Sequence, residues 1–193
     1  MVSAINSTDS ARVCAAIEEF LHVRAFIRFV AVEAFLSEQD GVVGEWGMNN
    51  FYLYRPPQLN RFTILPWDKS QAFVSGTFLS IWHNIQDVAE PARNRLLTRL
   101  LQYPDLRDLY LDTVLEAAAS ASALEPGDRR GWLEREIDRE VLQIRDAVFA
   151  DTTKPFSNEA FDADVAMLKA FAQQRPDVVR AEVARSRGTS RAF

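Results

Sequence analysis

Acidic and amide side chains flank two short apolar runs between residues 40 and 68 of the chain. Asp40 stands in a loop that contains several glycines, Asn50 comes directly before residues 51–54, and Asp68 follows shortly after residues 62–65. Both runs are rich in aromatic and β-branched residues, and the prolines between them favour a turn, so they predict a short antiparallel hairpin. Folding this hairpin would bring Asn50 and Asp68 to the same end of it.

These three side chains suit the chemistry of phosphoryl transfer. Asn50 and Asp68 offer hard oxygen ligands of the kind that hold Mg²⁺ or Mn²⁺ against the phosphates of a nucleotide. Asp40 could then accept the proton of an attacking hydroxyl group. A second interpretation stays open, in which Asp40 and Asn50 satisfy the backbone of a turn and Asp68 caps a bend, because these roles are common for Asp and Asn.

Few other side chains in the sequence suggest a reaction. Lys69 could face a phosphate beside Asp68, although a solvated lysine is the more common outcome. The two histidines, His22 and His83, have no partner at catalytic spacing and are expected to be structural. With Cys14 as the sole cysteine, neither an intramolecular disulfide nor a zinc site built on the usual ligands can be assembled.

Helices must carry the hairpin, since a two-stranded hairpin is only marginally stable by itself in water. Apolar residues at steps of three and four predict one long or kinked helix from Asp9 or Ser10 to about Leu36, followed by a loop over 37–50. After an irregular segment, the same spacing predicts one helix that begins near Pro91. It predicts three further helices over about 105–123, 130–149 and 157–185. The predicted fold class is therefore mainly α (α+β), with five or six packed helices and one short β-hairpin.

Composition places these elements in a single domain over residues 1–193. Hydrophobic residues make up 48% of the chain, which is enough for a substantial core. The formal net charge of −5 argues against a nucleic-acid partner, because phosphate binding needs clustered Lys and Arg. The most apolar window, 25–36, is interrupted by Arg28 and Glu33 and is too short for a membrane span, and the first residues lack the pattern of a signal peptide. The sequence leaves the compartment and the oligomeric state open.

One segment of the chain resembles a known family. The run DG…NNFYLY…RFTILPWDKSQAF, which begins at Asp40 and ends at Phe73, is similar to the signature of CotH-type (spore coat protein H) kinases. In that family an Asp-Gly loop, an Asn-aromatic-Tyr-Leu-Tyr strand and a Pro-Trp-Asp turn occur in this order. Downstream stretches at 94–97, 103–110 and 168–175 resemble the C-terminal region of the family, so the similarity covers roughly residues 9–183.

The resemblance implies a protein-kinase-like fold and an atypical kinase that transfers a phosphoryl group from ATP to Ser or Thr of a protein substrate. Asp40 would match the catalytic-loop Asp, Asn50 the metal-binding Asn, and Asp68 the Asp that holds Mg²⁺ (or Mn²⁺) against the phosphates of ATP. Family membership would also suggest a coat, cell-surface or secreted protein.

Two departures from the family pattern affect these expectations. Many members have a second Asp two residues after the Pro-Trp-Asp turn, where this chain has Ser70. No segment before Asp9 could form the N-terminal lobe that covers ATP, so residues 1–193 are expected to be the C-terminal portion of such a kinase domain, as a fragment, a truncated reading frame or a degenerate member. Weak metal binding and no measurable turnover are expected for the isolated chain. The alternative function is that of a non-catalytic coat or surface protein that uses the kinase-like fold to bind partners.

Overall fold

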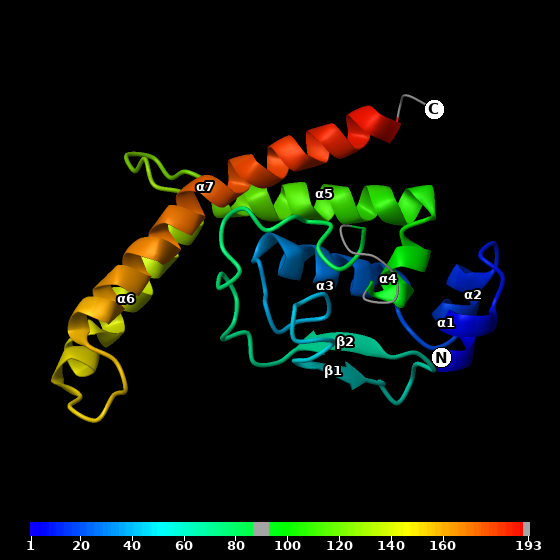
Figure 1. Ribbon diagram of the computed structural model, residues 1–193, viewed down its shortest axis with the longest axis horizontal. Coiled ribbons are helices and arrows are strands. Elements are labelled where there is room, and N and C mark those ends of the chain that lie inside the picture. Colours follow the sequence, from blue (N-terminus) through cyan, green and yellow to red (C-terminus); the bar gives the residue numbers. More distant parts are fainter. Residues whose placement is uncertain (87–92, 191–193) are drawn as a thin grey trace.

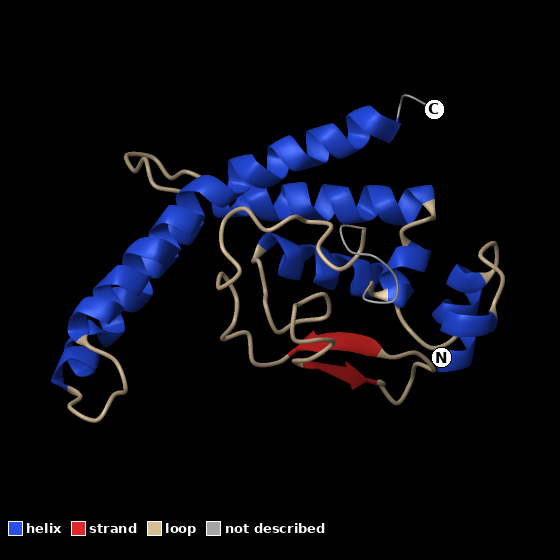
Figure 2. Cartoon of the chain, viewed as in Figure 1, coloured by secondary structure: helices blue, strands red, loops and turns tan. Residues whose placement is uncertain are grey.

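The computed structural model describes residues 1–86 and 93–190. Within these residues the protein is mainly helical and contains one two-stranded sheet, in which β1 (Phe51–Tyr54) pairs antiparallel with β2 (Thr63–Pro66). Figure 2 shows this small sheet on one side of a much larger helical body. The prediction of an α+β fold with one short hairpin is confirmed.

The body of the molecule is a stack of layers (Figure 1). The hairpin is the outer layer, and β2 contacts α3 (Val23–Phe35). On its other side α3 packs against α5 (Pro104–Ala121), and the C-terminal part of α7 (Asn158–Ser190) covers α5. Three shorter helices lie at the edge of this stack, namely α1 (Val2–Ser7), α2 (Val13–Glu18) and α4 (Arg95–Leu100).

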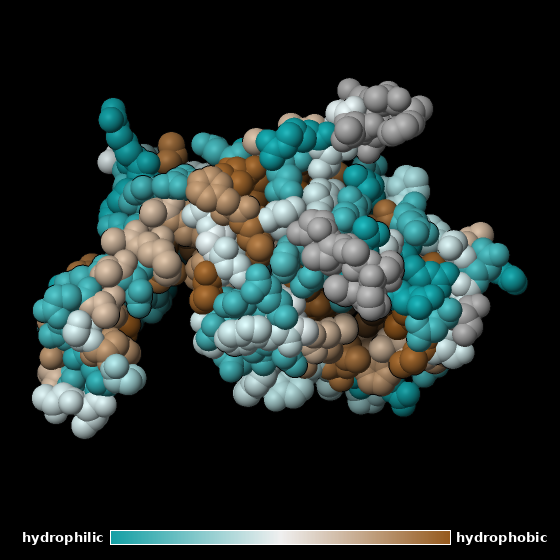
Figure 3. Space-filling model, in the orientation of Figure 1, coloured by the Kyte–Doolittle hydropathy of each residue, from teal (hydrophilic) through white to brown (hydrophobic). Residues whose placement is uncertain are grey.

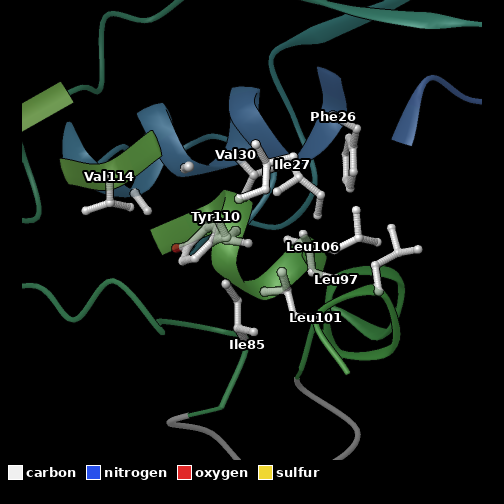
Figure 4. Close-up of a cluster of buried hydrophobic side chains, with 14 of the residues drawn as sticks. Phe26, Ile27, Val30, Ile85, Leu97, Leu101, Leu106, Tyr110 and Val114 are labelled. Carbon is white, nitrogen blue, oxygen red and sulfur yellow. The ribbon is translucent and has the colours of Figure 1, made fainter. Parts of the chain in front are cut away.

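The hydrophobic core lies where α3, α4 and α5 meet (Figure 4). The side chains labelled there are all buried: Phe26, Ile27, Val30, Ile85, Leu97, Leu101, Leu106, Tyr110 and Val114. Burial of one large apolar side chain contributes about 1.5–3 kcal/mol relative to its exposure to water. The core therefore fixes α3, the helix that leads into the Asp40 loop, firmly against the rest of the body.

The N-terminal helix is the element that the sequence predicts least well. The prediction of one long or kinked helix from Asp9 or Ser10 to about Leu36 is wrong in its continuity, because the chain forms α2 and α3 with a break around Leu21. At the break the backbone pairs with Phe62, which donates to the Phe20 carbonyl at 2.6 Å and accepts from the His22 N–H at 2.9 Å. These hydrogen bonds to the approach of β2 replace helical ones, so tertiary pairing overrides the local helical pattern.

The later helices follow the sequence more closely. α5, α6 (Trp132–Ala150) and α7 confirm the predicted helices, and α7 runs a few residues further than expected. α4 begins after Asn94, whose side chain accepts a hydrogen bond from the Leu97 N–H at 3.1 Å, while Pro91 lies outside the described residues. None of the helices along 1–86 and 93–190 combines the length and apolarity needed to cross a bilayer.

Helix α6 and the first part of α7 form a helical arm that projects from the body (Figure 1). α7 changes direction where it leaves the arm, and Pro176 lies inside the helix. Proline removes one N–H from the helical hydrogen-bond ladder and is a common cause of such bends. On the face shown in Figure 3, hydrophilic and apolar side chains are mixed over both the arm and the body.

A buried arginine joins the bend of α7 to the end of α3. Arg175 is fully buried and donates hydrogen bonds to the carbonyls of Ala34 and Phe35, at 2.6 and 2.9 Å. It also donates to the carbonyls of Thr77 and Leu79, each at 2.7 Å. Burial lowers the pKa of Arg175 to about 10, which leaves the guanidinium protonated at neutral pH. The carbonyls at the C-terminal end of α3 carry partial negative charge and therefore favour this cation.

Candidate functional site

The open end of the hairpin brings two of the predicted site residues together. Phe51 pairs with Pro66, and one step further the Trp67 N–H donates to the Asn50 carbonyl at 3.2 Å. Asn50 therefore accepts the last hydrogen bond of the ladder, and Asp68 directly follows its donor. Their φ angles are +54° and +40°, a region that is uncommon for residues other than glycine but is tolerated best by Asn and Asp. The backbone thus turns sharply at both positions.

Asp40 lies within hydrogen-bonding distance of the same end of the hairpin. One of its carboxylate oxygens accepts from the Asn50 side-chain amide at 2.8 Å, and the other accepts from the Asn49 side-chain amide at 2.9 Å. Since the NH₂ group of Asn50 faces Asp40, the amide oxygen of Asn50 occupies the other arm of the planar group and can serve as a ligand. The contact of Asn49 with Asp40 was not predicted from the sequence, although Asn49 is the first residue of the Asn-Asn pair in the motif.

The third predicted residue, Asp68, leaves most of its carboxylate available. It is exposed, and its Oδ1 accepts only a long hydrogen bond of 3.4 Å from the Ser70 N–H. No side-chain hydrogen bond joins Asp68 to Asn50 or Asp40 within the described parts of the chain, and the course of the backbone after β2 brings Asp68 to this end of the hairpin. A carboxylate with free oxygen lone pairs in this position suits a hard divalent cation.

The donor types of Asn50 and Asp68 suit a magnesium ion that is bound together with a nucleotide. Across residues 1–86 and 93–190, no group of three or more His, Cys, Asp or Glu side chains is arranged to hold a metal ion. Mg²⁺ usually keeps several waters and takes one or two carboxylates plus substrate phosphates, so it does not need a complete protein cage. The Asn50 amide oxygen and the Asp68 carboxylate meet that lower requirement.

Behind the exposed residues lies a buried charged pair that the sequence did not predict. Glu33, on α3, is 3% exposed, and its Oε1 lies 2.5 Å from the Lys69 ammonium group. The expectation that Lys69 is solvated is wrong, because its side chain folds inward beside Asp68 and is only 24% exposed. Burial raises the pKa of Glu33, while the hydrogen bonds from Lys69 and from the Val42 N–H oppose that rise.

A second buried carboxylate supports the Asp40 loop directly. Glu38 is 3% exposed, and its Oε1 accepts from the Asp40 N–H at 3.0 Å. Burial raises the pKa of Glu38, and the nearby carboxylates of Asp40 and Asp68 add to the rise. The interruption of the apolar window by Glu33 was the signal in the sequence for such a buried acid, whereas Glu38 carried no comparable signal.

Gly41 is required by the close packing of this loop. A Cβ atom added at Gly41 would lie 2.7 Å from Cγ of Glu38 and 2.8 Å from Oε2 of Glu33. We expect Gly41→Ala to lower the free energy of unfolding by about 1–3 kcal/mol, because overpacking forces neighbouring groups to move. Gly188→Ala is the matched control, since a Cβ there meets no atom within 4 Å. Chemical denaturation of both variants measures the difference. Equal free energies of unfolding would show that the loop accommodates a Cβ atom at Gly41.

Comparisons with known proteins show the family of the chain. The family model described as CotH kinase protein matches residues 1–179. The chain belongs to the CotH kinase family. The inner spore coat protein H of Bacillus subtilis (strain 168) is 23% identical to it over 184 residues, which cover 93% of this chain and 46% of that protein. The chain thus spans about half the length of this CotH relative, and no solved structure matches it.

Proposed function

We propose that this CotH family chain binds ATP with Mg²⁺ (or Mn²⁺) at the open end of the hairpin and supports transfer of the terminal phosphoryl group to Ser or Thr of a protein. One observation carries the proposal. The Asp40 carboxylate is hydrogen-bonded to the Asn50 amide at the end of the hairpin where Asp68 follows β2. The loop over 37–50 and the segment after β2 would together supply a proton acceptor and two oxygen ligands to one region.

Each side chain has a distinct task in this proposal. Asn50 and Asp68 would hold the divalent cation, which neutralises negative charge on the phosphates when it is bound. Asp40 would accept a hydrogen bond from the acceptor hydroxyl and orient the hydroxyl oxygen towards the terminal phosphorus of ATP. It would take the hydroxyl proton as the new P–O bond forms and the bond to the leaving ADP breaks. The amides of Asn49 and Asn50 hold the two oxygens of Asp40 in place for this task.

The exposed side of the hairpin offers a reason why the chain alone would turn over slowly. Exposed large apolar side chains on the two strands and directly after β2 are Tyr52, Leu53, Tyr54, Leu65 and Trp67. The hairpin is the outer layer of the body, so a nucleotide at its end would have water on one side (Figure 1). Phosphoryl transfer depends on positioning and on exclusion of water, and an uncovered nucleotide is poorly positioned. We therefore propose that efficient transfer needs a further protein segment or partner over this surface.

A non-catalytic role is the alternative, and one observation favours it. Ser70 replaces an acidic residue that many CotH family members carry, which leaves two protein ligands for the cation instead of three. The matched relative is named as a component of the inner spore coat. In this alternative the chain would keep the fold to bind partners in a coat or on a surface, without transferring phosphate.

Transfer of radiolabel from γ-labelled ATP separates the two proposals. The assay uses the longest reading frame that contains this chain, with Mg²⁺ or Mn²⁺ and with the protein itself and a Ser/Thr-rich protein as acceptors. We expect label on Ser or Thr that disappears when EDTA removes the metal. Absence of labelling from a folded protein with either metal would contradict the kinase proposal and favour the partner-binding role.

A further inference from the structure

The ion pair between Glu33 and Lys69 links the two loops that carry the proposed site residues. Lys69 directly follows Asp68, and its ammonium group reaches Glu33 on α3. The other carboxylate oxygen of Glu33 accepts from the Val42 N–H at 2.9 Å, two residues after Asp40. A single buried carboxylate therefore contacts both loops at once.

Backbone hydrogen bonds connect the same two loops on either side of this ion pair. The Gln39 N–H donates to the Gln71 carbonyl at 3.1 Å, and the Phe73 N–H donates to the Leu36 carbonyl at 2.7 Å. Residues 36–42 and 68–73 are thus joined at several points along their length. The Phe29 ring lies 5.4 Å from the Lys69 ammonium group and shields the ion pair on one side.

We propose that the ion pair between Glu33 and Lys69 sets the position of Asp68 relative to Asp40 and Asn50. This pair is called the brace below. Glu33 and Lys69 are positioning residues and do not touch the cation or the nucleotide. The part of this inference that concerns metal and nucleotide binding rests on the proposed function, whereas the coupling of the two loops does not.

Burial explains why the brace holds the loops firmly. An ionised carboxylate that loses its partner inside a protein carries an uncompensated desolvation penalty, so breaking one side of a buried pair disturbs the other side. Residues behind the first layer of metal ligands commonly change metal affinity by roughly 10- to 100-fold when they are replaced. Among the described residues, the hydrogen bond to the Asp68 side chain is the 3.4 Å one from Ser70, so we expect the position of Asp68 to depend on the adjacent Lys69 as well as on the hairpin backbone.

Three variants separate the brace from a direct contact between Lys69 and phosphate. Glu33→Gln keeps an oxygen for the Val42 N–H but removes the negative charge, Lys69→Met removes the positive charge, and the third variant combines both. Lys69→Arg is the conservative rescue, because it keeps a cation that can reach a carboxylate. Arg24→Met is the matched control, since Arg24 lies on the same helix in an exposed ion pair with Asp105.

Amide hydrogen exchange on the 193-residue chain measures the coupling of the loops. We expect Glu33→Gln and Lys69→Met each to raise exchange in both 36–42 and 68–73, with Lys69→Arg and Arg24→Met close to the parent protein. No rise in either variant, or a rise in only one of the two loops, would overturn the coupling.

Calorimetric titration with MnCl₂, alone and with ATP, measures the consequence for the site. We expect Glu33→Gln and Lys69→Met each to weaken Mn²⁺ binding roughly 10- to 100-fold, with no further loss in the double variant. If Lys69 instead contacts phosphate, Lys69→Met alone will weaken ATP binding while Glu33→Gln will not, and the brace is wrong. If the parent protein binds no Mn²⁺, the proposed function fails, and the exchange result still decides whether the loops are coupled.

Discussion

Replacement of Arg175 by methionine is expected to lower the free energy of unfolding by about 3–5 kcal/mol, the largest effect on stability that we predict. The guanidinium group supplies hydrogen bonds to four buried or partly buried carbonyls, those of Ala34, Phe35, Thr77 and Leu79. Methionine fills much of the same space but donates none of them, so each of these carbonyls would lose the hydrogen bond from the guanidinium group, although Ala34 would keep one from the Ser37 N–H. Equilibrium unfolding in urea, followed by circular dichroism, gives the difference.

Two further variants make this result interpretable. Arg139→Met is the control, because Arg139 forms only exposed ion pairs with Glu136 and Glu140, and such pairs contribute little to stability. Arg175→Lys keeps the charge with fewer donors and should fall between the parent protein and Arg175→Met, which covers the case in which Arg175→Met does not fold. Equal stabilities of Arg175→Met and Arg139→Met would show that the buried hydrogen bonds do not hold α7 to α3.

Replacement of Asp68 by asparagine is expected to lower phosphoryl transfer by roughly two to four orders of magnitude. The substitution removes the negative charge of a proposed metal ligand while it keeps the size of the side chain. Asparagine also tolerates the φ of +40° at this position, so the backbone should keep its turn. The measurement is the initial rate of γ-phosphate transfer by the longest reading frame that contains the chain.

Stability and a distant carboxylate provide the controls for Asp68→Asn. Because Asp68 is exposed, we expect the free energy of unfolding to change by no more than about 0.5 kcal/mol. Asp146→Asn, on the exposed surface of the arm, should leave the rate of transfer unchanged. A rate for Asp68→Asn that equals the parent rate would remove Asp68 from the site.

The hairpin and its polar ends could be predicted from sequence because they are local. Aromatic and β-branched runs define β1 and β2, and an antiparallel hairpin then brings the residues before one strand and after the other together without further information. The side-chain hydrogen bond between Asp40 and Asn50 joins residues only ten positions apart. This part of the site could be predicted because its residues are close in sequence and belong to a motif with a fixed order.

The remaining features depend on contacts between distant residues and could not be read from the same patterns. Lys69 and Glu33 are 36 positions apart, and lysine is usually solvated, so its inward orientation needs the packed body to explain it. The break at Leu21 arises from pairing with Phe62, which no local helical pattern reveals. Arg175 lies 140 positions from Phe35 and bonds to carbonyls, which leave no signature in side-chain identity.

The most direct test of the account is a crystal structure of the chain grown with MnCl₂ and a non-hydrolysable ATP analogue, with diffraction measured at the manganese absorption edge. We expect an anomalous peak within coordination distance of the Asp68 carboxylate and the Asn50 amide oxygen, with the terminal phosphate on the same ion and close to Asp40. A bound analogue whose manganese contacts neither Asp68 nor Asn50 would contradict the proposal that this end of the hairpin is a phosphoryl-transfer site.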